Sequence, residues 1–487
     1  MKMLAKLAAV TLTSALALSA CGGDTDTTTD PTTPAVDETT AAAPAPAETE
    51  ATEPAPAGEA MPAPAVNCEI PEGNLDATPA DLDAAEGEIT FMTQGLKGTF
   101  DDFFNKLIAD FQAENPGTTI TWTDQGGSDD FDTLMVTQAS NCTMADVINV
   151  PSSSILALSQ GNFLLNLDNK LPEAGERFVP GVWDSLKLGA GDSHTALPWY
   201  FGPFVTTYNK AIFEEAGLDP EKAPATMDEY FEFAKQITEK TDKYAIYGNT
   251  SWYLIPQLRA YGAKLMNDDF TEFTFASDPQ ALKWVTNMAE LYEAGGIPAD
   301  SITGELDMSR AFGDGDLAFG TPNASFLRNV QANSPAIYEV TGVGEEARQD
   351  GVGSLFNGQF IGVAATTENA NLAAKWADYV TSAQNGLAWA KFGIDTETAV
   401  VFPVTTEALE DPSLVGSDTT DPFNAARAAA AKGALDAEAY LPMFYVTGAV
   451  RQALINNMNL AISGQAEPQA ALEAAQAEMN TLLAQVR

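Results

Sequence analysis

The sequence LPWYFGPFVTTYNKAIFEEAGL, residues 197–218, is the most informative stretch of this chain. Shortly after it, Thr226 is followed three positions later by Glu229, which is the spacing of a helix capping box. The threonine oxygen can accept a hydrogen bond from the third helical amide while the glutamate reaches back, so we expect a helix to begin here. The side chains expected to point inward from this helix are Tyr230, Phe233, Ala234 and Ile237.

The first part of the folded chain has the pattern of a βαβ unit. A strand is predicted over 89–93, and apolar residues at helical spacing then predict a helix with Thr99 as its N-cap. The segments that follow predict two more strands, the second of them over 145–150. In open sheets of this kind ligands bind beyond the carboxyl ends of the strands, so the loops 94–98 and 151–154 are candidate site loops.

Later segments continue the alternation of strands and helices. Ser277-Asp-Pro279 predicts the start of a helix, and Gly295-Gly296 predicts its end. Further predicted pieces are helices at about 367–391 and 445–462 and strand-like segments at 317–320 and 360–364. This alternation, without an internal repeat, predicts an α/β fold. About 420 residues from Asn67 onward are too many for one compact core, so two lobes are expected.

The N-terminus has the features of a secretory signal. Two lysines precede an apolar run from 7 to 18, which is shorter than the roughly 20 residues that a membrane-spanning helix needs. The run ends in Leu18-Ser-Ala-Cys21, which resembles the lipobox of bacterial lipoproteins. We therefore predict a signal peptide over 1–20 and lipidation of Cys21, with an ordinary signal peptide that happens to contain a cysteine as the alternative.

Acidic residues dominate the charge of the chain. Residues 21–66 have almost no large apolar side chain, which predicts a lipidated, disordered, acidic tether. The net charge of the whole chain is −44 with only 24 basic residues, which repels phosphate backbones and anionic lipid. Nucleic acid is therefore excluded as a partner. Whether salt adaptation explains the acidic surface stays open.

Two cysteines remain if Cys21 carries lipid. In an extracytoplasmic compartment that permits disulfides, Cys68 and Cys142 are then an even pair. A disulfide between them is favoured over two free thiols, and it would pin the start of the folded part to the segment before Ala145.

Several segments share an order with one protein family. In residues 197–218 a Leu-Pro leads into a strand that ends in Tyr-Asn-Lys and a short helix that ends in Ala-Gly-Leu, and Pro224-Ala-Thr-Met-Asp-Glu229 follows. This order resembles the signature of the sugar-binding, maltose-binding-protein-like type of bacterial extracellular solute-binding proteins, family 1. Further segments that resemble this family, over about 85–487 in the expected order, are 145–148, 158–167, 312–319, 462–464 and 468–472.

The resemblance implies a two-lobed periplasmic-binding-protein fold, similar to type II, with hinge crossings and a ligand cleft between the lobes. By analogy lobe one comprises 67–200 and 357–400, and lobe two comprises 201–356 and 401–487. The implied function is that of the extracytoplasmic substrate-binding subunit of an ABC importer, which captures a small carbohydrate and delivers it to a membrane permease when the lobes close. We expect a monomer without cofactor, held at the bacterial cell membrane only by its lipid.

A sugar-binding site needs flat aromatic side chains that pack on the sugar ring and polar side chains that hydrogen-bond to its hydroxyls. Trp199 and Tyr200 are expected to border the ligand at the interlobe crossing, and Trp252 is expected to stack on it. The family's loops also indicate contacts from Gln94, Lys97, Ser152, Ser153, Asn323, Phe326, Asn357 and Gln359. Gln94 and Ser153 could equally be caps, and Asn323 a turn residue. The tryptophans expected in the core are Trp122, Trp284, Trp376 and Trp389.

Other classes of protein fit the sequence less well. A secreted glycosidase needs two suitably placed carboxylates, but no acidic pair stands on adjacent predicted strand ends. His194, the only histidine, is expected to be exposed, not catalytic, and no cysteine or histidine spacing suits a metal. A sensor or adhesin with the same fold would bind a solute equally well, and the sequence does not identify the sugar. We therefore expect no enzymatic activity.

Overall fold

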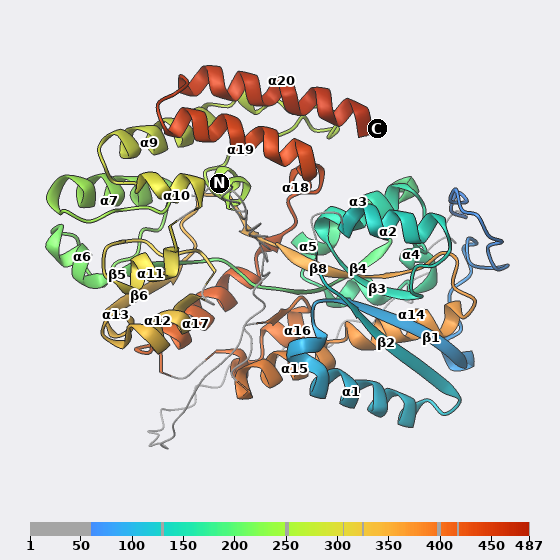
Figure 1. The fold of residues 1–487 in the computed structure, drawn as a ribbon. Helices are drawn as coiled ribbons and strands as arrows, with labels where there is room; N and C mark the ends of the chain where they lie inside the picture. The colour runs from blue at the N-terminus through green and yellow to red at the C-terminus, as the bar shows by residue number, and fades with distance from the viewer. Residues whose placement is uncertain are drawn as a thin grey trace, which may run out of the picture.

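The computed structural model describes residues 60–486, apart from the short segments 128–130, 249–252, 305, 324–325, 397–400 and 416–417. The predicted signal peptide, Cys21 and most of the predicted tether lie outside the described residues, as does Trp252. The described chain forms two α/β lobes (Figure 1). In this part of the chain, no helix combines the length and the apolar character needed to cross a membrane.

Lobe one is built on a six-stranded sheet with the order β2-β1-β3-β8-β4-β9. Its strands are β1 Gly87–Gln94, β2 Thr118–Gln125, β3 Val147–Pro151, β4 Ala196–Phe201, β8 Gly358–Val363 and β9 Phe402–Pro403. The first strand pairs in parallel with both β2 and β3, which confirms the predicted βαβ unit. By contrast, β8 runs antiparallel to β3 and β4.

Aromatic side chains pack the helices of lobe one against one another. The main helices are α1 Lys97–Glu114, α2 Phe131–Ser140, α3 Ser152–Gln160, α14 Ala370–Val380 and α15 Ala383–Asp395. Phe100 and Phe104 of α1 lie edge-on to Trp389 of α15, with ring centroids 5.3 and 5.2 Å away. The predicted cap at Thr99 is wrong, because α1 already begins at Lys97 and has no side-chain cap. The predicted core tryptophans Trp122, Trp284, Trp376 and Trp389 are all buried.

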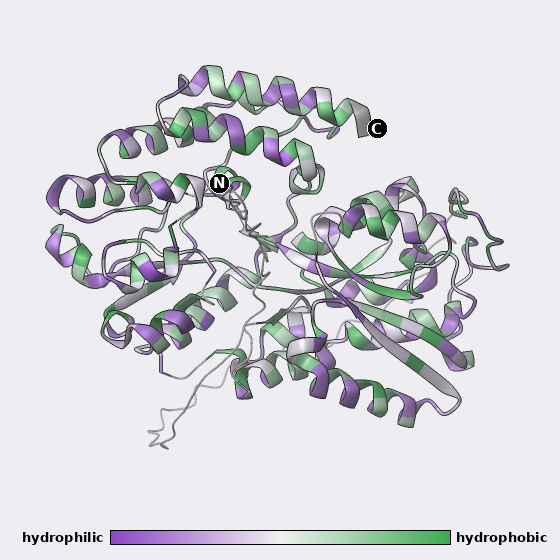
Figure 2. Ribbon diagram, viewed as in Figure 1, coloured by the Kyte–Doolittle hydropathy of each residue, from purple (hydrophilic) through white to green (hydrophobic). Residues whose placement is uncertain are grey.

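Lobe two has a smaller sheet and more helix. Its strands β5 Val205–Asn209 and β6 Thr341–Glu345 pair antiparallel, and isolated bridges from Tyr208 to Phe319 and from Tyr244 to Leu317 widen the sheet. The main helices are α6 Lys210–Glu215, α7 Met227–Lys240, α8 Leu254–Ala260, α9 Pro279–Glu293, α17 Pro422–Ala434, α19 Gly448–Ile462 and α20 Pro468–Val486. Figure 2 shows hydrophilic and hydrophobic residues alternating along α19 and α20, which pack on α9.

The predicted capping box starts α7. The Thr226 hydroxyl accepts a hydrogen bond from the Glu229 amide at 3.1 Å, and the Glu229 carboxylate accepts from the Ala225 amide at 2.8 Å. These bonds confirm the predicted start of the helix. The buried face differs in part, because α7 buries Phe231 with Ala234 and Ile237, and leaves Tyr230 and Phe233 half-buried.

In the residues that the structure describes, three segments of chain join the lobes. One leads from β4 to β5, a second passes through β7, Ser354–Leu355, into β8, and a third contains β10, Ala437–Glu438, which pairs in parallel with β7. The predicted lobe boundary at 401 is therefore too early. Because β9 at Phe402–Pro403 pairs with β4, this part of the chain still belongs to the sheet of lobe one.

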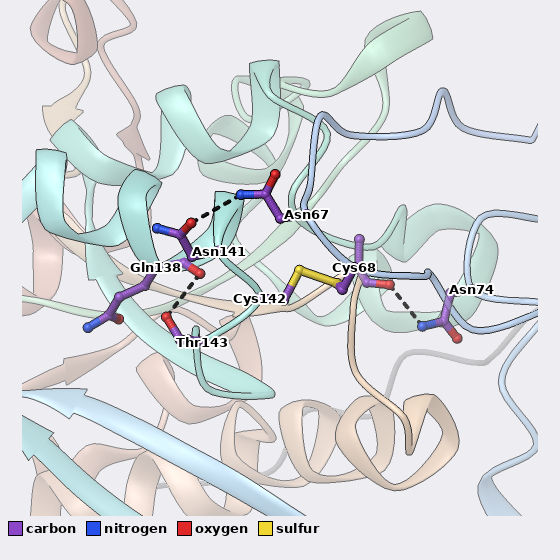
Figure 3. The surroundings of a disulfide bond; sticks show 8 residues. Asn67, Cys68, Asn74, Gln138, Asn141, Cys142 and Thr143 are labelled. Carbon is purple, nitrogen blue, oxygen red and sulfur yellow. Dashed lines mark hydrogen bonds between the residues drawn. A yellow bond between two sulfur atoms is a disulfide. The ribbon is translucent and has the colours of Figure 1, made fainter.

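A disulfide fastens the N-terminal segment of the described chain to lobe one (Figure 3). It joins Cys68 to Cys142, whose Cα atoms lie 6.3 Å apart, just after α2 ends. Next to it, the Asn67 side chain donates to Asn141 at 3.1 Å, and the Asn67 amide donates to the Ser140 carbonyl at 3.1 Å. The segment is thus held to the end of α2 by covalent and polar contacts.

Candidate functional site

One edge of the lobe-one sheet collects four predicted site residues. The parallel strands β1, β3 and β4 all end there, and β8 begins there, since Gln359 lies opposite both Pro151 and Tyr200. The chain crosses to lobe two from this edge after β4 and returns to it before β8. We call this place the lobe-one edge and define it by Gln94, Ser152, Tyr200 and Gln359.

A buried amide organises the lobe-one edge. Asn149 of β3 is fully buried, accepts a hydrogen bond from the Gln94 amide at 3.1 Å, and donates to the Gln359 side-chain oxygen at 3.0 Å. It thereby ties the end of β1 to the start of β8 and orients the Gln359 side chain. The sequence analysis missed Asn149. The available signal was one amide side chain inside an otherwise apolar strand, because a buried amide must find partners.

Three polar groups of the lobe-one edge are available to hydrogen-bond a ligand. Within the described part of the chain, the Gln94 side-chain amide, the Ser152 hydroxyl and the Gln359 amide nitrogen have no hydrogen-bond partner. Tyr200, half-buried, lies beside Gln359 in the sheet. Asn357 precedes β8 and is exposed. These neutral donors and acceptors, next to one aromatic ring, can bind a polar and uncharged solute.

Lys97 and Ser153 have other partners. The Lys97 ammonium lies 4.8 Å from the centre of the Trp122 ring, whose indole nitrogen donates to the Thr93 hydroxyl at 2.9 Å. The Ser153 hydroxyl donates to Asp132 of α2 at 2.9 Å. Ser153 therefore ties α3 to α2, and it is not the cap that the sequence left open, because the N-cap of α3 is Pro151.

Trp199 does not lie where it was expected. Its side chain is only 3% exposed, and its indole nitrogen donates to the carbonyl of Val380 in α14 at 3.2 Å. Its ring centroid lies 4.8 Å from that of Trp389. The strand register shifts between Pro198 and Tyr200, and Trp199 at this irregularity enters the core of lobe one. The residue thus packs in the core instead of bordering the space between the lobes.

The candidate residues of lobe two lie among aromatic side chains and turns. Tyr253, which directly follows the segment that contains Trp252, lies edge-on to Phe204 at 5.9 Å. Asn323 is exposed, and its amide donates to the Thr321 hydroxyl at 3.2 Å, which is the turn role that the sequence left open. Phe326 is only 8% exposed and packs edge-on against Phe312 at 5.3 Å, so its place is in the core.

His194 is buried, which corrects the expected exposure. Its side-chain nitrogens lie 2.9 Å from an Asp168 carboxylate oxygen and 3.0 Å from the Trp183 carbonyl oxygen, and its ring stacks on Trp183 at 3.7 Å. Burial acts to raise the pKa of Asp168, but hydrogen bonds from His194 outweigh it and lower that pKa. These contacts fix the loop before β4. In the residues that the structure describes, no group of three or more His, Cys, Asp or Glu side chains is arranged to hold a metal ion.

Comparison with known proteins gives a consistent assignment. The family model for bacterial extracellular solute-binding proteins matches residues 97–387. A solved structure, that of the cyclic alpha-maltosyl-1,6-maltose binding protein from Arthrobacter globiformis, has a TM-score of 0.66 at 19% sequence identity. The superposition covers 82% of this chain and 99% of that protein. At this identity the likeness shows the shared two-lobed fold.

Two curated relatives carry the same name, sn-glycerol-3-phosphate-binding periplasmic protein UgpB. The protein from Agrobacterium fabrum is 31% identical over 163 residues, which are 34% of this chain and 32% of the relative. The chain therefore matches about a third of the length of that relative. The protein from Escherichia coli strain K12 is 23% identical over 349 residues, which are 66% of this chain and 77% of the relative.

Proposed function

Because the chain belongs to the family of bacterial extracellular solute-binding proteins, we propose that it is the substrate-binding subunit of an ABC importer. In this proposal a small carbohydrate binds between the two lobes, and the closed form delivers it to a membrane permease. Binding energy then shifts the population from open to closed lobes, so that the permease meets mainly the loaded form. The protein acts by binding, without catalysis, outside the cytoplasm.

The lobe-one edge carries this proposal. Its uncommitted groups, on Gln94, Ser152 and Gln359, are neutral and include both donors and acceptors, which is the pairing that sugar hydroxyls require. Tyr200 supplies an aromatic ring at the same edge. Trp252 stays in the proposal as the stacking residue of lobe two.

A phosphorylated polyol is the second candidate ligand. The two relatives named above are binding proteins for sn-glycerol 3-phosphate. In this chain α3 begins at Ser152, and the amides at a helix N-terminus favour a phosphate. Against it, the cation found near the edge, Lys97, already lies over the Trp122 ring. A neutral carbohydrate therefore fits the described residues better.

A thermal-shift screen tests the proposed function. The panel contains mono- and oligosaccharides, polyols and sn-glycerol 3-phosphate, each added to the purified protein. A ligand at 100 times its Kd adds about 2.7 kcal/mol to the free energy of unfolding, which a melting curve resolves. We expect a neutral sugar to raise Tm most. A rise with sn-glycerol 3-phosphate alone would select the second candidate, and no rise with any compound would reject both.

Gln359→Ala should weaken binding of the sugar found in that screen by about 1 kcal/mol, because one neutral hydrogen bond to the ligand is lost. Isothermal titration calorimetry measures the change in Kd. Gln160→Ala, at the exposed far end of α3, is the matched control and should keep the affinity of the natural chain. Equal affinities for both variants would remove the lobe-one edge from the binding site.

Cys21→Ser should release the protein from membranes. In the proposal the lipid is the membrane anchor, because each buried methylene of its acyl chains adds about 0.8 kcal/mol of binding. Serine lacks the thiol to which the lipid is attached, so the variant has no anchor. Cell fractionation followed by immunoblotting measures the distribution. A variant that sediments with membranes as the natural chain does would contradict the anchor at Cys21.

A further inference from the structure

One arginine ties lobe two to two of the three crossings. Arg259 of α8 is only 5% exposed. Its guanidinium donates to the Gly353 carbonyl at 2.7 Å, just before β7, and to the Glu438 carboxylate of β10 at 2.5 Å. Because β7 and β10 pair with each other, a single side chain of lobe two holds both crossing strands.

A second ion pair acts on the same strands. Arg348, in the loop between β6 and β7, lies 3.1 Å from a carboxylate oxygen of Asp436, directly before β10. Arg348 lines a cavity of about 770 Å³ together with other residues of the loop after β6, Asp436 and Glu438, and the cavity also includes Gly353, which Arg259 contacts. The segment from β6 to β7 thus connects the sheet of lobe two with the crossing strands through charged contacts.

A buried carboxyl lies within this charged cluster. Glu346 is 8% exposed, and within the described residues its Oε2 atom has no hydrogen-bond partner. Burial raises its pKa to about 7, although the charges of Arg259 and Arg348 act to lower it. The titratable and charged groups around it and its cavity are Arg259 and Tyr253 of the α8 segment, Arg348 and Asp350 of its own loop, Glu345 of β6, and Asp436 and Glu438 at β10.

The neighbouring residue, Ala347, connects this cluster with β5 of lobe two. The Ala347 amide donates to the Thr206 hydroxyl of β5 at 3.0 Å, and Ala347 lines a small hollow together with Tyr253 and Pro322. Burial raises the pKa of Tyr253, and nearby groups, Glu346 among them, add to this rise. The loop that contains Glu346 thus contacts β5 through Ala347 and the segment before β10 through Arg348.

We propose that Glu346 is a proton-sensitive element of the hinge. When its carboxyl releases a proton to solvent, the new negative charge competes with Glu438 and Asp436 for Arg259 and Arg348. The contacts of these two arginines with the β7 and β10 segments then weaken, and the lobes move more easily relative to each other. Because the folded state favours the neutral carboxyl, its contribution to stability is complete below the ordinary glutamate pKa of 4.5 and is lost as the pH rises from there through the folded pKa of about 7.

Hydrogen exchange of the protein without ligand tests this proposal. Peptides that cover β7 and β10 are followed at pH 6 and pH 8, and each rate is divided by its intrinsic rate at that pH. In the natural chain we expect protection to fall several-fold at pH 8. Glu346→Gln, which keeps the shape and removes the titration, should show the same protection at both values. Because no ligand is present, the outcome does not depend on the proposed solute.

Glu345→Gln is the matched control. Glu345 lines the same cavity but is exposed and pairs with Lys432 at 3.1 Å, so this variant should keep the pH dependence of the natural chain. Glu346→Met gives a second non-titrating variant if Glu346→Gln fails to fold. The same loss of protection in Glu346→Gln or Glu346→Met as in the natural chain, or no loss in the natural chain, would overturn the proposal.

Discussion

Replacing Trp199 by alanine is expected to lower the free energy of unfolding by about 3–5 kcal/mol, the range for a large aromatic side chain removed from a core. The indole is 3% exposed and packs against Trp389 at 4.8 Å and Phe104 at 5.8 Å. Its hydrogen bond to the Val380 carbonyl is lost as well, which leaves that acceptor without its partner. Urea denaturation followed by circular dichroism measures the change.

Tyr200→Ala is the control for this prediction. Tyr200 is the next residue of β4 but is half-buried. Its replacement should lower the free energy of unfolding less than Trp199→Ala does, and it should weaken solute binding more. The two variants therefore separate a packing role from a binding role on adjacent residues. A Trp199→Ala protein with unchanged stability and weakened binding would restore the expectation drawn from the sequence, that Trp199 borders the ligand.

Removing the disulfide by Cys68→Ser together with Cys142→Ser is expected to cost about 4 kcal/mol of stability. The bond closes a loop over a sequence separation of 74 residues, and without it the unfolded chain gains that conformational freedom. The melting temperature of the double variant, beside that of the natural chain, measures the effect. Reduction of the natural chain with dithiothreitol provides a second route to the same state.

The double variant treated with dithiothreitol is the control for the reduction experiment. Adding dithiothreitol to the double variant should leave its melting temperature unchanged, since no bond is left to reduce. Mass spectrometry of non-reduced peptides that showed both thiols free in the natural protein would contradict the assignment. A double variant as stable as the natural chain would show that the contacts of Asn67 with Ser140 and Asn141 hold the segment alone.

The lobe-one edge and the charged cluster of Arg259, Arg348 and Glu346 both involve the crossing that contains β7. Gln359 follows β7 by only a few residues, and β7 is the strand whose start Arg259 holds through the Gly353 carbonyl. A solute bound at Gln359 therefore acts close to the place where Arg259 and Arg348 fasten the crossings to lobe two. Proposed binding and proposed hinge control thus lie on one continuous segment of chain.

Local signals in the sequence determined much of the architecture. The capping box at Thr226 and the start of α9 at Pro279 depend on residues within one helical turn, so the sequence contains both partners of each interaction. The same holds for the βαβ order of β1, α1 and β2, because periodicity identifies each element. Thr99 shows the limit of such reasoning, since the N-cap of α1 is Leu96, three residues earlier, and no side chain caps the helix there.

The sequence by itself thus determined the order of the elements, the two lobes and the family, because each of these is encoded in short segments. Only the tertiary structure decided which of the candidate residues meet. Asn149 and Gln359 are 210 residues apart in the chain, and Arg259 and Glu438 are 179 apart. The burial of Trp199 and His194 likewise depends on strand register and on neighbours from other elements. Local periodicity contains no information on such partners, since they are set by how distant segments pack.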